Sequence, residues 1–222
     1  EKAGIIKPKI PVVVGEKRKR LIKLFTNISL KLNSPIFFTN EKTVNNNKKL
    51  KQADYQLNNI DLARKIVELV NDIKIDQNKI LDGISNFKYN TNFKGRWQIV
   101  KKKPLVIVDC AHNVDAFNKI ISQLESLGKK IKMIFGTLNK IDQIKIIDIL
   151  PKHFFYYFCE PKIDRFMPIE KIKNRANKNK LQFKAYQSSL NAYNDALSES
   201  DLNDLIFVTG SNFVVSEILK SF

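Results

Sequence analysis

The chain has 222 residues, of which 43% are hydrophobic and 10% aromatic, so it is long enough for one large or two small globular domains. Its formal net charge is +17, from 39 Lys and Arg against 22 Asp and Glu. No apolar run approaches the ~20 residues of a membrane span, and the first residues lack the hydrophobic region of a signal peptide. We therefore expect a cytoplasmic protein with no membrane partner, and the start without Met indicates a fragment of a longer protein.

The excess positive charge has two interpretations. Basic stripes bind phosphate backbones, which would indicate a nucleic-acid-binding protein. Here the basic residues are mostly Lys spread over the whole chain, and the densest runs, 16–20 and 101–103, contain no interleaved aromatic side chains for base stacking. We therefore expect a solvated basic surface that attracts anionic small molecules, and no nucleic-acid partner. Steeply salt-dependent binding to random DNA would support the other interpretation.

The two cysteines, Cys110 and Cys159, each end an apolar run, and neither belongs to a CxxC pair. This spacing does not match a zinc site. We expect two reduced thiols in packed surroundings.

The first ninety residues mix helices and strands. Strands are predicted at 10–14 and 35–40, and helices at 18–32, 59–71 and 76–86. Asp76 is the expected N-cap of the last of these helices. The Lys- and Asn-rich stretch 39–53 is predicted to be an exposed loop, and the polar stretch 87–93 a linker. The chain would then divide into two domains, residues 1–92 and residues 93–222.

From Gly95 onward, strands and helices alternate regularly. Strands are predicted near 96–100, 104–109, 131–135, 154–159, 182–186 and 205–209. Helices are predicted near 114–127, 141–150, 168–179, 189–199 and 212–221. In the first of these helices the apolar residues from Phe117 to Leu127 fall on one face, with Gly128 as the C-cap. This alternation predicts right-handed βαβ units and a mostly parallel sheet, which is an α/β fold.

The apolar run 105–108 ends abruptly in Asp109, and His112 and Asn113 follow before the next helix. Ligands of open α/β sheets bind at the carboxyl ends of strands. Asn113 is the better cap for that helix, which leaves Asp109 for a ribose hydroxyl or a metal-bound water. His112 could then receive a carboxylate or stabilise a developing negative charge. In the alternative interpretation, Asp109 merely caps the helix and His112 is a polar loop residue.

Other positions carry weaker signals. Arg96, in the segment Gly-Arg-Trp-Gln, has a planar guanidinium suited to phosphate, although a surface salt bridge is the default for a single Arg. Ser211 can cap the last helix, and the same helix start could bind an anion. Arg165 is a weaker candidate at another strand exit. The sequence contains neither a GxxxxGK[ST] phosphate loop nor a GxGxxG segment, so a nucleotide enzyme would need its phosphate loop from elsewhere.

Taken together, these segments resemble the folylpolyglutamate synthase/dihydrofolate synthase family, a branch of the Mur-ligase-like ATP-dependent amide ligases. The resemblance runs nearly end to end and is carried by six motifs in family order. They are EKAGIIKP at 1–8, YQLNN at 55–59, GRWQ at 95–98, DCAHN at 109–113, FG at 135–136 and VTGS at 208–211. It implies that residues 1–92 are the C-terminal part of a Mur-ligase central ATPase domain. Residues 93–222 would be the small Rossmann-like α/β ligase C-terminal domain.

The resemblance also implies a role for each matching residue. Lys2 corresponds to a lysine that is carbamylated in the family, and its new carboxylate would help to bind Mg²⁺, which prefers oxygen ligands. The positions that contact ATP in the family correspond to Asn59, Arg96 and Asp109. The positions near the incoming glutamate and the acyl phosphate correspond to His112 and Ser211, and the catalytic pair would be Asp109 and His112.

The implied reaction has two steps. ATP phosphorylates the carboxylate of dihydropteroate or folate, and the amino group of L-glutamate then attacks the acyl phosphate, with catalysis supplied by positioning and electrostatics. The implied protein is a cytoplasmic monomer of folate biosynthesis that uses ATP and Mg²⁺. The sequence leaves open whether it makes dihydrofolate, extends polyglutamate tails, or does both.

The chain also departs from the family. The family's phosphate loop and its Mg²⁺-binding Glu and His are not in this sequence, so we predict that residues 1–222 alone do not turn over ATP. Cys110 stands where a Gly is common in the family. Two related alternatives remain: a Mur-type ligase acting on cell-wall nucleotide precursors, and a non-catalytic remnant of the ligase fold.

Overall fold

The computed structural model describes residues 2–16, 18–39, 53–70, 75–161 and 163–222. These residues form two compact units. The first contains residues 1–46 and 55–92, and the second contains residues 93–222 with the short stretch 47–54, in each case as far as they are described. That these units are the two functional domains named above stays a prediction. None of the described helices is long and apolar enough to cross a membrane.

The first unit begins with a small parallel β-arrangement. A 3₁₀ helix, η1 (Lys2–Ile5), is followed by β1 (Val12–Val14), α1 (Lys19–Lys31) and β2 (Ile36–Phe38). β1 and β2 pair in parallel, with Val12 opposite Ile36. The predicted elements are confirmed here, with the two strands shorter than expected. Most of the predicted 39–53 loop lies outside the described residues.

Two helices, α2 (Asp54–Leu69) and α3 (Gln77–Thr91), complete the first unit. The predicted cap is confirmed, because the Asp76 side chain accepts a hydrogen bond from the backbone N–H of Asn78 at 2.6 Å. The prediction of a linker at 87–93 is wrong: α3 continues to Thr91, and Asn92 ends it in the left-handed conformation. Lys and Asn residues occur on exposed helix faces as well as in loops, so the polar composition of this stretch does not distinguish the two.

The second unit is built on a six-stranded sheet. Its strands are β3 (Gln98–Lys102), β4 (Leu105–Val108), β5 (Ile131–Phe135), β6 (Phe155–Cys159), β7 (Gln182–Tyr186) and β8 (Leu205–Thr209). They lie in the order β3-β4-β8-β5-β6-β7. All neighbouring pairs are parallel except β3 and β4, which are antiparallel. The predicted, mostly parallel α/β sheet is therefore confirmed.

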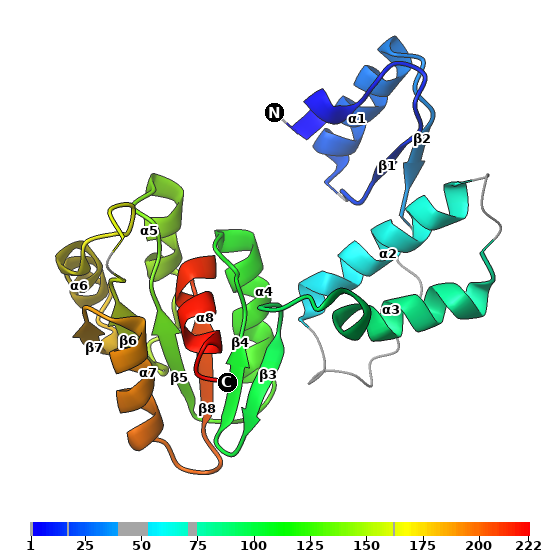
Figure 1. Ribbon diagram of the computed structural model, residues 1–222. Helices are drawn as coiled ribbons and strands as arrows, with labels where there is room; N and C mark the ends of the chain where they lie inside the picture. Colours follow the sequence, from blue (N-terminus) through cyan, green and yellow to red (C-terminus); the bar gives the residue numbers. More distant parts are fainter. Residues whose placement is uncertain (1, 17, 40–52, 71–74, 162) are drawn as a thin grey trace. The chain divides into compact units, whose positions relative to one another are not determined.

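Helices cover both faces of this sheet (Figure 1). They are α4 (Val114–Glu125), α5 (Ile141–Asp148), α6 (Ile169–Lys178), α7 (Ser189–Ser198) and α8 (Asn212–Leu219). α4, α5 and α6 contact one another in sequence, and α7 packs against α8. Right-handed crossovers place the first three on one face and the last two on the other. The central strands β4, β5, β6 and β8 are buried on both sides, which explains why they are almost entirely apolar, whereas the edge strands β3 and β7 are partly exposed and carry polar residues.

The core of this unit is aliphatic and aromatic on both faces. On the α7/α8 face, Val208, Ala192 and Val214 belong to one buried cluster. On the opposite face, the ring of Phe117 in α4 lies edge-on to Phe135 in β5, with centroids 5.7 Å apart. The apolar stripe predicted for α4 is confirmed. The helix ends at Glu125, before the predicted glycine, and Gly128 turns the chain with φ of +62°.

The strand order determines where a ligand can bind. β8 lies between β4 and β5, yet the chain leaves β4 and β5 toward the α4/α5 face and leaves β8 toward α8 on the other face. Neighbouring strands whose connections go to opposite faces leave a crevice at their carboxyl ends, where α/β proteins bind ligands. The DCAHN and TGS segments lie at the two sides of this point.

Candidate functional site at the strand exits

The exits of β4, β8 and β5 are packed backbone against backbone. The N–H of Gly210 donates to the carbonyl of Ala111 at 3.1 Å, which joins the β8 exit to the β4 exit. A Cβ atom on Gly210 would lie 2.6 Å from the carbonyl oxygen of Gly136 at the β5 exit. Gly210 also has a φ of +101°, which side chains rarely tolerate. Glycine is therefore required for these three loops to meet.

Asp109 is the buried centre of this arrangement. Its side chain has an exposed fraction of 0%, and its carboxylate accepts the backbone N–H groups of Trp97 and Ala111, each at 2.8 Å. Each carboxylate oxygen therefore accepts one N–H group within the protein, and a contact of Asp109 with a ligand stays a prediction. The capping residue is Asn113, as predicted, because its side chain accepts the N–H of Ala116 at 2.9 Å. Asp109 instead ties the loop that carries Arg96 to the end of β4.

The loop before β3 is held in an unusual backbone conformation. Gly95 and Trp97 both have positive φ, +74° and +41°. The Trp97 side chain is 1% exposed and its ring lies 5.6 Å from that of Phe207 in β8. The N–H of Gly95 donates to the side chain of Gln98 at 2.9 Å. With its two neighbours anchored in this way, Arg96 has a defined backbone position.

Arg96 lines a pocket of about 620 Å³ within the second unit. Its Nη1 lies 4.0 Å from the Asp109 carboxylate, and 29% of its side chain is exposed. The pocket is lined by Phe93, Lys94, Gly95, Arg96, Cys110, Asn212, Val215, Ser216, Leu219 and Lys220. Three of these residues are cationic and none is acidic, so the pocket favours an anionic ligand.

Cys110 faces the same pocket and is half-buried. Burial raises the pKa of its thiol to about 11, with Arg96 lowering it and Asp109 raising it by smaller amounts. The thiol is therefore neutral near pH 7. Its sulfur packs against Gly95, where an added Cβ atom would lie 2.8 Å from it. Cys159 is fully buried at the end of β6, where burial also raises the pKa of its thiol.

His112 and Ser211 differ in burial: the His112 side chain is exposed, whereas the Ser211 side chain is buried and caps a helix. The Nδ1 of the exposed His112 lies 3.0 Å from the carbonyl oxygen of Cys110, a contact in which Nδ1 donates. In the neutral ring this leaves the Nε2 lone pair for a ligand. Ser211 is 4% exposed and caps α8, because its hydroxyl oxygen accepts the N–H of Val214 at 3.2 Å. The predicted cap is confirmed, and a contact of Ser211 with glutamate stays a prediction.

Lys2 and Asn59 belong to the first unit. Lys2 is exposed in η1. Asn59 is exposed on α2, where its side-chain amide nitrogen lies 3.4 Å from the side-chain oxygen of Gln56. Asn59 also lines a groove of about 440 Å³ between α2 and α3. Their roles toward Mg²⁺ and ATP stay predictions. No group of three or more His, Cys, Asp or Glu side chains that could hold a metal ion occurs in the described part of the chain.

Sequence reasoning missed part of the Arg96 pocket. Trp97, Lys94 and Lys220 were not singled out, although Trp97 is the one tryptophan of the chain and lies beside Arg96. The available signal was this unique aromatic residue directly after the arginine and two positions after Gly95. Lys220 comes from the end of α8, and no sequence pattern connects it with residue 96.

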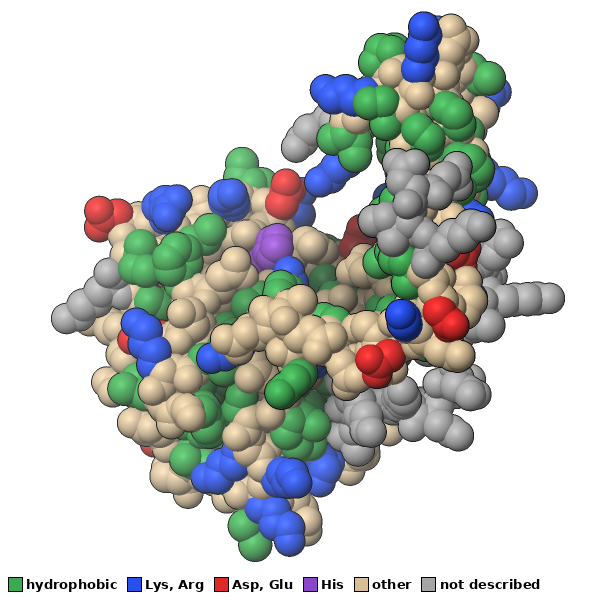
Figure 2. Space-filling view, turned by 45° about the vertical axis from the view of Figure 1, so that its right-hand side comes forward, with side chains coloured by type: hydrophobic (Ala, Val, Ile, Leu, Met, Phe, Trp, Pro, Cys, Tyr) green, Lys and Arg blue, Asp and Glu red, His purple; other side chains and the backbone are tan. Residues whose placement is uncertain are grey.

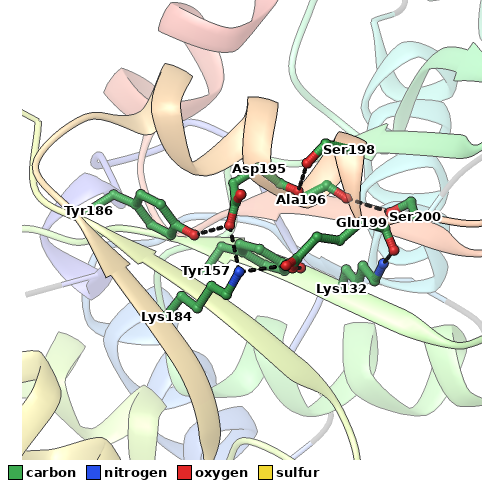
Figure 3. Close-up of polar contacts among 9 residues, drawn as sticks. All are labelled: Lys132, Tyr157, Lys184, Tyr186, Asp195, Ala196, Ser198, Glu199 and Ser200. Atoms are coloured by element: carbon green, nitrogen blue, oxygen red, sulfur yellow. Dashed lines mark hydrogen bonds and ion pairs between the residues drawn. The ribbon is translucent and has the colours of Figure 1, made fainter.

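A further polar cluster connects β5, β6 and β7 with the end of α7 (Figure 3). Lys184 donates to Asp195 at 3.0 Å and to Glu199 at 2.5 Å, and the Tyr157 hydroxyl donates to Glu199 at 2.6 Å. The Tyr186 hydroxyl also donates to Asp195. Every charge in this group has a partner, which indicates a structural role.

On the face seen in Figure 2, the surface charge of the described residues does not form one stripe. Lys and Arg side chains on this face are separated by hydrophobic and uncharged surface. This distribution agrees with the interpretation of the net charge of +17 as a solvated surface.

Comparison with known proteins gives consistent relationships. The family described as Mur ligase, glutamate ligase domain, matches residues 95–212. The dihydrofolate synthase/folylpolyglutamate synthase of Buchnera aphidicola subsp. Schizaphis graminum is 26% identical over 237 residues, which cover 99% of this chain and 55% of that protein. The protein of the same name from Buchnera aphidicola subsp. Acyrthosiphon pisum is 30% identical over 156 residues, covering 66% of this chain and 35% of the relative.

Solved structures share the fold. The bifunctional folylpolyglutamate synthase/dihydrofolate synthase of Yersinia pestis, in complex with AMPPNP and Mn, superposes with a TM-score of 0.81 at 18% identity, covering 99% of this chain and 55% of the other. Escherichia coli FolC in complex with DHPP and ADP gives a TM-score of 0.81 at 20% identity, covering 100% and 55%. The chain thus spans about half the length of the proteins it matches.

Proposed function

The chain belongs to the Mur ligase family, and we propose that it is part of an ATP-dependent ligase that adds L-glutamate to dihydropteroate, to folates, or to both. The named relatives, dihydrofolate synthases/folylpolyglutamate synthases, support this substrate class. The observation that carries the proposal is the position of Arg96. It stands between two anchored residues beside a cationic pocket, at the point of the sheet where α/β proteins bind ligands.

The pocket residues fit a nucleotide. Arg96, Lys94 and Lys220 supply positive charge for phosphate oxygens, and the exposed side chains of Asn212 and Ser216 supply polar groups. The apolar part, formed by Phe93, Val215 and Leu219, offers surface to a flat base or ribose. We assign Asp109 to the positioning of Arg96, because its buried carboxylate accepts the backbone N–H groups of Trp97 and Ala111.

In the proposed reaction the folate carboxylate is activated as an acyl phosphate, and the amino group of glutamate displaces phosphate. His112 is exposed at the β4 exit and its Nδ1 donates to a backbone carbonyl, so the Nε2 lone pair is available to the amino group of the incoming glutamate. Catalysis would rest on holding cationic groups where negative charge develops, which costs little reorganisation during the reaction.

The described residues do not by themselves form a magnesium site, since no cluster of three or more suitable side chains occurs among them. A requirement for Mg²⁺, which would neutralise phosphate charge, remains part of the proposal through a carbamylated Lys2. Mass spectrometry of the intact protein tests that modification, because carbamylation adds one carboxyl group to the lysine.

The proposal is tested by ADP formation. The full-length gene product containing this chain should form ADP only when L-glutamate and a pteroate or folate acceptor are both present. Residues 1–222 alone should not. Comparing dihydropteroate with folates shows which acceptor is used, and a UDP-linked muramoyl peptide tests the cell-wall alternative. Absence of glutamate-dependent turnover with every acceptor would overturn the proposal and leave a non-catalytic ligase fold.

A further inference from the structure

The loop between β6 and α6 brings Arg165 to the same carboxyl edge of the sheet. Its backbone is held by the β5 exit: the N–H of Asn139 donates to the carbonyl of Arg165 at 2.9 Å, and the N–H of Met167 donates to the carbonyl of Thr137 at 2.9 Å. Thr137 directly follows the glycine whose carbonyl lies against the β8 exit. The Arg165 loop therefore continues the row of contacts that joins the exits of β4, β8 and β5.

The Arg165 side chain is stacked on an aromatic ring. Its guanidinium carbon lies 5.8 Å from the ring centroid of Phe213, the second residue of α8. Phe213 is itself supported by Phe166, with ring centroids 5.9 Å apart, and 38% of it is exposed. A cation over a ring face is attracted to it, and the contact limits the conformations of a long side chain. Less entropy is then lost when a ligand binds.

The charge of Arg165 is not neutralised within the described part of the protein. Arg64, Arg96 and Arg175 each lie within 4.0 Å of a carboxylate, whereas Arg165, which is exposed, forms no ion pair with any described residue. The neighbouring Asp164 is also exposed and makes no ion pair with it. The N–H groups at the edge of the guanidinium are thus left for an external acceptor.

We propose that Arg165 binds a carboxylate of a glutamate unit, either the incoming amino acid or a glutamate already attached to the acceptor. This inference rests on the proposed ligase function and identifies a specificity residue for it. A guanidinium fork matches a carboxylate with two parallel N–H···O bonds. The exposed ring of Phe213 beside it would contact the methylene groups of the same glutamate. Ser211, two residues earlier, places this pair next to the strand-exit site.

The test compares Arg165→Ala, Arg165→Lys and the control Lys171→Ala in the full-length protein. Lys171 is an exposed cation on α6 of the same unit. Loss of a charge-assisted contact should raise the KM for the glutamate-bearing substrate roughly 10- to 100-fold in Arg165→Ala. The KM for ATP should not change. Arg165→Lys, which keeps the charge but not the fork, should give an intermediate KM, and Lys171→Ala should match the wild type.

Two acceptors distinguish the two sources of the carboxylate. If Arg165 binds the incoming amino acid, its loss raises the KM for L-glutamate with every acceptor. If it binds an attached tail, only the KM for acceptors that already carry glutamate rises, and dihydropteroate is unaffected. If the wild type is active and Arg165→Ala has the wild-type KM for every substrate, this inference is overturned and the proposed ligase function still holds. A wild type without glutamate-dependent turnover would overturn both.

Discussion

The carboxylate of Asp109 at the end of β4 accepts the backbone N–H of Trp97 at 2.8 Å, although twelve positions separate the two residues. The bond closes the β3–β4 hairpin at its open end. It thereby holds Arg96, the residue before Trp97, beside the pocket that Arg96 lines. The strand-exit aspartate thus acts on the site through the backbone.

Asp109→Asn should destabilise the protein and weaken nucleotide binding together. An amide has one acceptor oxygen where the carboxylate has two, so one buried backbone N–H of Trp97 or Ala111 loses its partner. An unsatisfied buried donor costs about 1 to 3 kcal/mol. Chemical denaturation should show a loss of unfolding free energy in that range.

The matched control is Asp201→Asn, because Asp201 is an exposed aspartate of the same unit. Its unfolding free energy should stay within about 0.5 kcal/mol of the wild type. An Asp109→Asn protein as stable as this control would show that the buried carboxylate does not anchor the loop.

Gly210→Ala should be more damaging than Gly128→Ala, although both glycines have positive φ, +101° and +62°. At Gly128 a Cβ atom meets nothing within 4 Å, so only backbone strain of about 1 to 2 kcal/mol is expected. At Gly210 it would also lie 2.6 Å from a backbone oxygen, which raises the expected cost to about 2 to 5 kcal/mol. Equal unfolding free energies for the two variants would contradict the close packing of the strand exits.

Cys110 should react slowly with alkylating reagents at neutral pH, because its pKa is raised to about 11 and the thiolate is the reactive form. The rate, followed by mass spectrometry of the Cys110 peptide, should rise as the pH approaches 11. ATP should slow it further, since Cys110 lines the proposed nucleotide pocket. Cys110→Ala, which keeps only the buried Cys159, gives the background. Labelling that ATP leaves unchanged would place the nucleotide elsewhere.

The cluster in Figure 3 should make the second unit sensitive to acid. The hydroxyl of Tyr186, together with Lys184, lowers the pKa of Asp195 from 3.8, and Lys184, together with Tyr157, lowers the pKa of Glu199 from 4.5. A lowered folded-state pKa stabilises the protein above the unfolded-state value, and this stabilisation is lost as the pH falls through the folded-state value. The unfolding free energy should therefore decline below about pH 4.5.

Lys184→Met tests the origin of this decline. The variant should lose less unfolding free energy than the wild type between pH 7 and pH 3, because its carboxyl groups have lost the ammonium that favours their charged form. The control is Lys152→Met, because Lys152 is exposed in a turn and forms no ion pair with any described residue. This variant should lose as much unfolding free energy as the wild type over the same pH range. Identical pH profiles for all three proteins would mean that the cluster does not contribute.

The regular part of the fold was predictable because its pattern is strong. The strand at 131–135 and the strand at 205–209 were predicted to the residue, since each is a mostly apolar run between polar turns. The prediction failed at 87–93, where helix and loop share the same polar residues. Local sequence preference does not distinguish the two, and in the structure α3 continues to Thr91, where Asn92 ends it in the left-handed conformation.

The site was predicted in position but not in every role. The DCAHN motif located the β4 exit, and Asn113 was assigned correctly as the cap. The burial of Asp109 could not be read from the sequence, because its partner Trp97 adopts a positive φ that tryptophan seldom takes. Lys220 reaches the pocket from the other end of the unit, which only the strand order explains.

The central claim is that Arg96 contributes directly to nucleotide binding. Its most direct test is the dissociation constant of ATP, measured by calorimetry on the full-length protein, for the wild type, Arg96→Ala and the control Lys102→Ala. Lys102 is an exposed cation on β3 outside the pocket. Losing a charged hydrogen bond to phosphate should weaken ATP binding roughly 10- to 100-fold in Arg96→Ala and leave Lys102→Ala unchanged. An Arg96→Ala protein that binds ATP as tightly as the wild type would contradict the account.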